Sequence, residues 1–126
     1  MNKNIKIISG KLEFPVELNN SRTSQEIIKK LPIVSTANRW GDEIYFKIPV
    51  YIELENGIET LDIGSVAYWP PGNAFCIFFG RTRASIEEKP QAASPVTLVG
   101  KIADDSYLRY LKEIMDGDII ELRISD

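Results

Sequence analysis

Aromatic and basic side chains gather in one stretch of the sequence, GSVAYWPPGNAFCIFFGRTR at residues 64–83. A Tyr-Trp pair precedes Pro-Pro-Gly and a Phe-Phe pair follows it, so the rings either pack a core or line a pocket for a flat apolar group. Arg81 and Arg83 lie two residues apart and project to one side of an extended chain, where they would suit a carboxylate or a phosphate. A solvated loop balanced by Glu87 and Glu88 is the alternative for these arginines.

The composition removes most catalytic chemistries. The chain has no histidine, which takes away the usual proton shuttle, the commonest metal ligand and every Ser-His or Cys-His nucleophile pair. Its single cysteine, Cys76, excludes a disulfide within the chain and a zinc site built on cysteines. The acidic pairs Asp104-Asp105 and Asp116/Asp118 fall at expected helix ends and turns, where carboxylates serve as caps. We therefore expect no metal site and no cofactor.

Length and charge predict the class of the protein. The 126 residues suit a single domain over positions 1–126, and 44% hydrophobic with 26% charged residues is a globular mixture. A net charge of −3 with scattered Lys and Arg argues against a nucleic-acid partner. No apolar run approaches the roughly 20 residues that span a bilayer, and residues 1–8 lack the continuous apolar region of a signal peptide. We expect a cytoplasmic protein without a membrane partner.

Alternation of apolar and polar residues predicts strands over most of the chain, because successive side chains of a strand point to opposite faces. Residues 5–18 predict a hairpin, and residues 33–54 predict two or three further strands. The Asn56-Gly57 pair favours a tight hairpin turn, so the chain is expected to fold straight back through residues 58–64.

Two segments predict helices. Thr23 and Glu26 have the Thr-x-x-Glu spacing of a capping box, and Pro32 ends that helix. The segment 104–117 starts with capping residues and closes with Gly117. Its apolar residues recur at the spacing of one buried helix face: Tyr107, Leu108, Leu111, Ile114 and Met115. With eight or nine short strands, this pattern favours a mostly β, closed antiparallel barrel whose two short helices plug its ends.

Three runs of the sequence carry a resemblance to a known family: GDEIYFKIP, AYWPPGNAFCIFFG and PVTLVGKI. They resemble the cyclophilin-like family of small prokaryotic proteins, long classed as a domain of unknown function. The resemblance covers essentially the whole chain. It implies a closed, eight-stranded antiparallel barrel with one short helix capping each end.

The chain is also similar, more distantly, to the cyclophilin prolyl isomerases. In that layout Phe79 matches a phenylalanine that lines the proline pocket, and Tyr45 and Lys47 fall on the Phe-His-Arg strand. Lys47 then stands where a guanidinium is required, and a lysine cannot offer the planar fork of an arginine. Ile77 replaces a glutamine, and the Gln-Gly-Gly-Asp turn has no counterpart. Arg81 and Arg83 stand where the cyclophilin-like family tends to have prolines.

We interpret the chain as a noncatalytic module that binds a peptide or small ligand near Phe79 and Tyr45, beneath the long polar loop 81–94. The candidate ligand-binding residues are Tyr45, Lys47, Trp69, Phe79, Arg81 and Arg83. The alternative is a prolyl isomerase using Tyr45, Lys47 and Phe79, because twisting a prolyl amide needs no acid, base or nucleophile. A third alternative is a self-associating barrel whose edge is its working surface, and the oligomeric state stays open.

Overall fold

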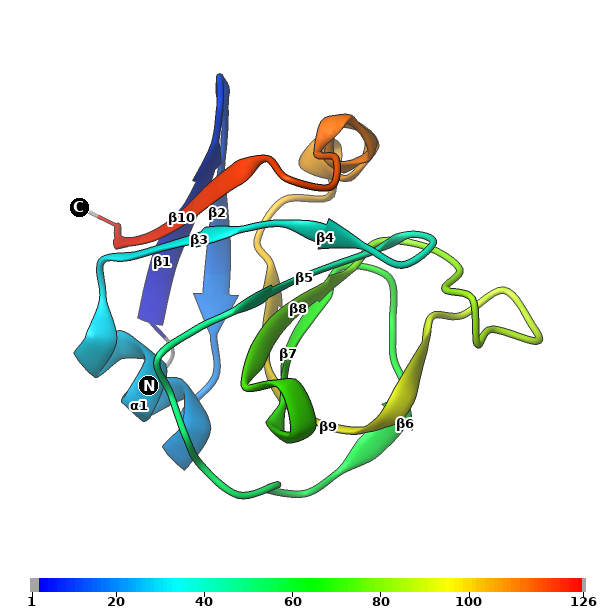
Figure 1. The fold of residues 1–126 in the computed structure, drawn as a ribbon, viewed down its shortest axis with the longest axis horizontal. Helices are drawn as coiled ribbons and strands as arrows, with labels where there is room; N and C mark the ends of the chain where they lie inside the picture. Colours follow the sequence, from blue (N-terminus) through cyan, green and yellow to red (C-terminus); the bar gives the residue numbers. More distant parts are fainter. Residues whose placement is uncertain (1–2, 126) are drawn as a thin grey trace.

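The computed structural model describes residues 3–125, which form ten strands, one α-helix and two 3₁₀ helices (Figure 1). The first half of the chain contains β1 (Lys3–Ser9), β2 (Leu12–Leu18), α1 (Arg22–Lys30), β3 (Ile33–Thr36), β4 (Asn38–Arg39) and β5 (Glu43–Lys47). The second half contains β6 (Ile58–Thr60), β7 (Ser65–Trp69), η1 (Pro70–Gly72), β8 (Ala74–Phe78), β9 (Gln91–Ile102), η2 (Asp105–Glu113) and β10 (Ile119–Ile124).

The strands pair antiparallel in the order β3-β10-β1-β2-β9-β7-β8-β5-β4, and β6 pairs with β9 beside this path. The path ends at β3 and at β4, so the sheet is open and the expected closed, eight-stranded barrel is wrong. At Ala37, the single residue between β3 and β4, the backbone pairs with the turn before β10: its amide donates to the Asp118 carbonyl at 2.8 Å and its carbonyl accepts from the Gly117 amide at 2.9 Å, so the strand ladder is interrupted between the two ends of the sheet. Beside this interruption, the Ser35 hydroxyl donates to the Lys47 carbonyl at 2.7 Å, a side-chain link between β3 and β5.

The larger of two hydrophobic cores, the main core, lies on one face of the strands. Alternate residues supply it, as the two-residue period of a strand requires: Ile5 and Ile7 in β1, Ile44 and Phe46 in β5, Phe75 and Ile77 in β8. Ile27 of α1 and Leu111 of η2 are fully buried in the same cluster. Both helices therefore cover the main core.

A smaller core, which we call the second layer, lies on the opposite face of β7 and β8. It consists of Leu61, Ala67, Ala74, Cys76, Phe78, Ala92 and Val96, with Tyr45 and Trp69 packed partly buried against it. All five residues of β8 are buried, because this strand has a core on each face. The aromatic residues of 64–83 are thus divided between the two cores, with Tyr68 and Phe79 in the main core and Phe78 in the second layer.

Helix α1 begins differently from the expected capping box. Ser21 is the N-cap residue, and its side chain accepts from the Ser24 amide at 3.1 Å. Thr23 lies inside the first turn, where its hydroxyl donates to the Glu55 carboxylate at 2.9 Å. The capping box is therefore wrong, because a carboxylate distant in sequence takes up the Thr23 hydroxyl that the local pattern assigned to the cap.

The second expected helix is the 3₁₀ helix η2, with Asp104 as its N-cap. The predicted stripe is only partly buried: Leu111 and Ile114 lie in the main core, whereas Met115, beyond the end of the helix, is 56% exposed. The prediction for Met115 is wrong because it extended the α-helical spacing past the end of η2. No helix among residues 3–125 is long and apolar enough to cross a membrane.

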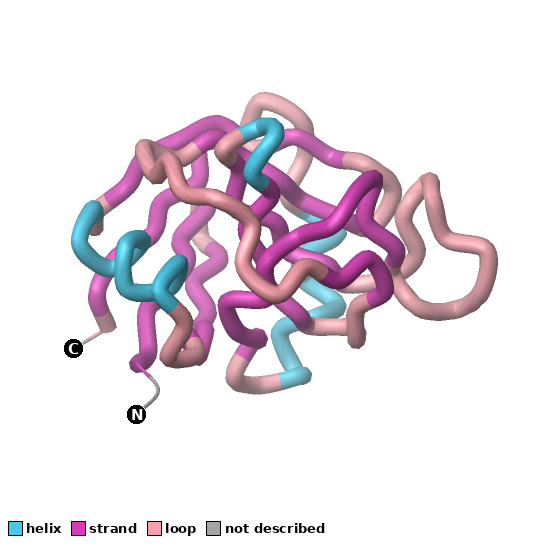
Figure 2. The backbone as a smooth tube through the Cα atoms, turned by 90° about the horizontal axis from the view of Figure 1, so that it is seen from below, coloured by secondary structure: helices cyan, strands magenta, loops and turns pink. Residues whose placement is uncertain are grey.

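The Asn56-Gly57 turn does not join a hairpin, so that prediction is also wrong. Asn56 has the expected positive φ of 47°, but residues 48–57 form no strand and β6 pairs with β9. The long-range contact decides the path, because the Glu55 amide donates to the Thr97 hydroxyl of β9 at 2.8 Å. After β8, residues 81–90 form a loop that projects from the molecule, at the right of Figures 1 and 2.

Candidate functional site

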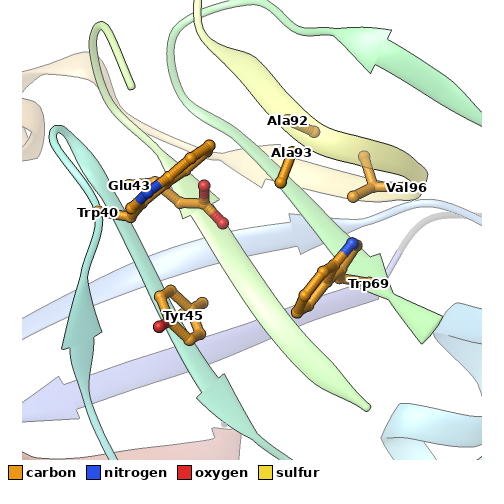
Figure 3. Close-up of a pocket in the computed structure, with 7 residues that line it drawn as sticks. All are labelled: Trp40, Glu43, Tyr45, Trp69, Ala92, Ala93 and Val96. Atoms are coloured by element: carbon orange, nitrogen blue, oxygen red, sulfur yellow. The ribbon is translucent and has the colours of Figure 1, made fainter. Parts of the chain in front are cut away.

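A pocket of about 240 Å³ opens beside the second layer. Its lining comes from three segments: Trp40, Glu43 and Tyr45 in β5 and the turn before it, Trp69 at the end of β7, and Ala92, Ala93 and Val96 in β9. Figure 3 shows Trp40 and Tyr45 on one side, Trp69 across from them, and the Glu43 carboxyl pointing into the space between. The site is an aromatic pocket with one acidic group.

The turn between β4 and β5 places Trp40 and Glu43. These two residues exchange backbone hydrogen bonds of 2.9 and 3.2 Å, which close a tight turn over Gly41 and Asp42. Gly41 has φ +63°, and a Cβ there would lie 2.9 Å from the Arg81 carbonyl oxygen. The Asp42 amide donates to that same carbonyl at 2.8 Å. Only glycine permits this approach without strain, so the turn is held against the chain that leaves β8.

Arg39 fixes the same turn from the other side. Its guanidinium donates to the Gly41 carbonyl at 2.9 and 3.1 Å and to the Ile114 carbonyl at 3.0 Å. It also pairs with Asp42 at 3.3 Å and lies 5.1 Å from the centre of the Phe79 ring. A planar group with several donors suits this role, since it satisfies carbonyls and stacks on a ring together.

The opposite wall of the pocket is the Trp69 indole. Its Nε1–H donates to the Ser94 hydroxyl at 2.8 Å, which ties the end of β7 to β9. The backbone of Gly72 lies against the ring, because a Cβ on Gly72 would be 2.7 Å from two of its carbons. The Pro-Pro-Gly turn therefore sets the orientation of the indole.

Glu43 is the acidic group of the pocket and is only 6% exposed. It lies on the same face of β5 as Tyr45, opposite Ile44 and Phe46, which point into the main core. Burial raises its pKa from the ordinary 4.5 to about 7, and a hydrogen bond from the Cys76 thiol opposes the rise. Near neutral pH the pocket therefore holds a carboxyl that exchanges between its neutral and ionised forms.

A model of the family described as cyclophilin-like matches residues 3–123 of the chain. The chain belongs to the cyclophilin-like family. It is also similar to the solution structure of a hypothetical protein from Archaeoglobus fulgidus, with 38% identity and a TM-score of 0.81 over 98% of this chain and 95% of that chain. No curated protein matches the chain. The descriptions of these relatives name neither a ligand nor a reaction.

The pocket of this cyclophilin-like chain offers few reactive groups. Burial, reinforced by the charge of Glu43, raises the pKa of the Cys76 thiol well above its usual range, so the thiol stays protonated and unreactive. Within residues 3–125 no three His, Cys, Asp or Glu side chains gather to hold a metal ion. The chemistry that remains is binding by aromatic faces and exchange of one proton at Glu43.

The six residues predicted from the sequence lie in four places. Tyr45 and Trp69 line the pocket, one on each side. Phe79 lies in the main core, 7% exposed, beneath the Arg39 guanidinium. Lys47 is exposed farther along β5 and does not line the pocket.

The predicted arginines lie at the base of the projecting loop. Arg81 and Arg83 are both exposed, and the Arg81 guanidinium donates to the Ser85 carbonyl at 3.3 Å within the loop. The structure does not bring them to the pocket wall. Of the loop predicted to overhang the site, the part that lines the pocket is the start of β9, at Ala92 and Ala93.

Sequence reasoning missed Trp40, Glu43 and the β9 residues. Glu43 did leave a signal in the run GDEIYFKIP, because it shares strand parity with Tyr45 and puts a charge on a face that carries aromatic residues. Trp40 left a weaker one as the residue before the Gly-Asp turn. Ala92, Ala93 and Val96 left none, since small apolar residues in a strand are ordinary.

Proposed function

We propose that the pocket beside the second layer binds one flat or apolar group, either a small molecule or a side chain of a peptide, without changing it chemically. The observation that carries the proposal is the meeting of three large aromatic side chains, Trp40, Tyr45 and Trp69, at one cavity. Large rings usually bury their faces in a core, so rings that converge on an open cavity favour a ligand.

The size of the pocket limits the ligand. At about 240 Å³ it is smaller than the roughly 300–1,000 Å³ of sites for drug-sized molecules. One ring with a short substituent, or one or two side chains, fits such a space. Contact with the β9 wall would come through Ala92, Ala93 and Val96, whose small side chains leave room for a ring.

Amide chemical shifts recorded during titration with benzyl alcohol and with a blocked Ala-Pro-Phe peptide test the proposal. We expect shifts at Trp40, Tyr45 and Ala93, and we expect Trp69→Ala to weaken binding about tenfold or more by loss of one wall. Tyr51→Ala is the matched control, because Tyr51 is 75% exposed and lies outside the pocket. If neither compound shifts the amide signals of the pocket residues, the proposal is overturned.

No observation favours the prolyl isomerase alternative, which required Tyr45, Lys47 and Phe79 to share one socket. Phe79 packs in the main core while Tyr45 lines the pocket on the other face, so these two rings lie on different faces of the strands. A protease-coupled assay on a short Xaa-Pro substrate tests this alternative. We expect no acceleration by the wild-type protein.

A further inference from the structure

Glu43 brings one negative charge to a pocket whose other walls are apolar. Among residues 3–125 no lysine or arginine forms an ion pair with it. Arg39 and Lys47 are the nearest cations along the chain, each four residues away. Arg39 is engaged by Asp42, by three carbonyls and by the Phe79 ring, and Lys47 is exposed outside the pocket. A carboxylate that loses water without gaining a countercharge is costly, so the site is electrostatically incomplete.

The groups around Glu43 do not complete it. On β8 the facing titratable group is the Cys76 thiol, a weak donor. On β5 the groups on its own face are Tyr45 and the exposed Lys47, and β9 contributes only Ala92, Ala93 and Val96 to the pocket.

The aromatic walls add to the same preference. The face of an aromatic ring carries partial negative charge and attracts a cation within about 6 Å, most strongly for tryptophan. Trp40, Tyr45 and Trp69 line the cavity together with the Glu43 carboxyl (Figure 3). The ring faces and the Glu43 carboxylate therefore both favour positive charge in the ligand.

We propose that the pocket takes a small organic cation, an amine or guanidine carried on a short apolar group, with the Glu43 carboxylate as its counter-ion and the faces of Trp40, Tyr45 and Trp69 as its walls. This inference rests on the proposed function, since it specifies the charge of the ligand that the pocket binds. Such a cation is supplied either by a free amine or by a lysine or arginine side chain of a peptide.

Two probes of similar shape but different charge show whether the pocket recognises the charge of a ligand or only its shape. Benzylamine stays protonated between about pH 6 and pH 8, because alkylamines titrate near pH 10. Benzyl alcohol has the same ring and no charge. Both tryptophans of the chain line the pocket, so tryptophan fluorescence reports binding there without a label. We expect benzylamine to bind about tenfold or more tightly than benzyl alcohol at about pH 8.

The pH dependence and one substitution assign that difference to Glu43. Benzylamine affinity is expected to rise from about pH 6 to about pH 8 as Glu43 ionises. Glu43→Gln is expected to remove this rise and to bring the affinities for benzylamine and benzyl alcohol to within about threefold of each other. The control Glu53→Gln removes an exposed carboxylate outside the pocket and is expected to change neither.

The outcomes distinguish this inference from the proposed function. Failure of both probes to bind overturns both proposals. The cation inference is overturned if the two probes bind equally, or if benzylamine binds more tightly below about pH 6 than at about pH 8. Either result leaves the pocket as a site for neutral groups. Blocked lysine and blocked arginine amides form a further arm: tighter binding than benzylamine assigns the cation to a peptide side chain, and weaker binding assigns it to a free amine.

Discussion

At the scale of single residues, Glu43 connects the pocket to the stability of the fold. Its pKa is raised by burial, so between pH 4.5 and about 7 the folded state binds a proton that the unfolded state has released. Stability therefore falls as pH rises through this window. Perturbed pKa values of this kind cluster at binding and catalytic sites, which agrees with the role proposed for Glu43.

Substitution of Glu43 by glutamine makes this cost measurable. Urea unfolding from about pH 5 to about pH 8 is expected to show wild-type stability falling relative to Glu43→Gln by up to roughly 3 kcal/mol, because a tenfold change in proton affinity is worth about 1.4 kcal/mol. The glutamine amide can change stability by an amount that does not vary with pH. The comparison therefore uses the slopes of stability against pH, which this constant change does not affect. Glu53→Gln should follow the wild-type profile, and parallel profiles for Glu43→Gln and wild type would contradict the assignment.

Gly72 controls the pocket through one close contact. Adding a Cβ there places it 2.7 Å from the Trp69 ring, so the indole must move by about 1 Å to restore an ordinary contact of about 3.5–4 Å. We expect Gly72→Ala to weaken benzyl alcohol binding several-fold and to change tryptophan fluorescence, with less than about 1 kcal/mol lost in stability. Pro71→Ala, in the same turn, is the control, and equal effects from the two substitutions would refute the role of this contact.

At the scale of elements, the site depends on the turn between β4 and β5. Arg39 and Gly41 hold this turn against the chain that leaves β8, and Trp40 and Glu43 project from it into the pocket. The turn is only four residues long, yet its contacts reach the segments after β8 and after η2. Its precision therefore comes from tertiary contacts rather than from local propensity.

Removal of the Arg39 guanidinium tests this dependence. Arg39→Met keeps the apolar stem but loses the hydrogen bonds to carbonyls, so we expect about 2–3 kcal/mol of destabilisation in urea together with weaker probe binding. Arg39→Lys should recover less than half of the loss, because an ammonium has no planar fork. Arg83→Met, at an exposed position, should change stability by less than about 0.5 kcal/mol. Full recovery by lysine would show that only the charge matters.

Local sequence patterns predicted the positions of the strands better than they predicted which strands pair with each other. Alternation in residues 5–18 predicted a hairpin, and β1 and β2 form it. The Asn56-Gly57 turn and the Thr23 cap were assigned incorrectly because Thr97 and Glu55, far away in sequence, provide the contacts that decide each place. Closure of the sheet is a long-range property of the same kind, which strand patterns do not encode.

The candidate site was predictable only in part, for a related reason. Tyr45 and Trp69 are large and stand on opposite sides of the pocket, so aromatic content was enough to find them. The acidic group was overlooked because a glutamate after a Gly-Asp turn is typical of surface loops. The role proposed for Glu43 depends on its burial beside β8 and β9, which follows from tertiary packing.

At the scale of the whole molecule, the two cores are expected to separate stability from the proposed binding. The main core contains residues from nearly every element, whereas the second layer is small and borders the pocket. Strand β9 takes part in both, with Val96 in the second layer and Val99 in the main core. The pairing of β9 with β7 shifts register between Val66 and Ala67. This shift lies close to the point where the buried side chains of β9 change from the second layer to the main core.

Val96 and Val99 give a matched test of that separation, since they are the same residue type, three apart on one strand, and both almost fully buried. Val99→Ala leaves a cavity in the enclosed main core, so we expect a loss of about 2 kcal/mol in urea and probe affinities within twofold of wild type. Val96→Ala enlarges a pocket that is already open, so we expect about 1 kcal/mol or less and a change of several-fold in the affinity for benzyl alcohol. If Val99→Ala altered probe binding as strongly as Val96→Ala, the two cores would be energetically one, and the pocket would be a part of the folding core instead of a site built upon it.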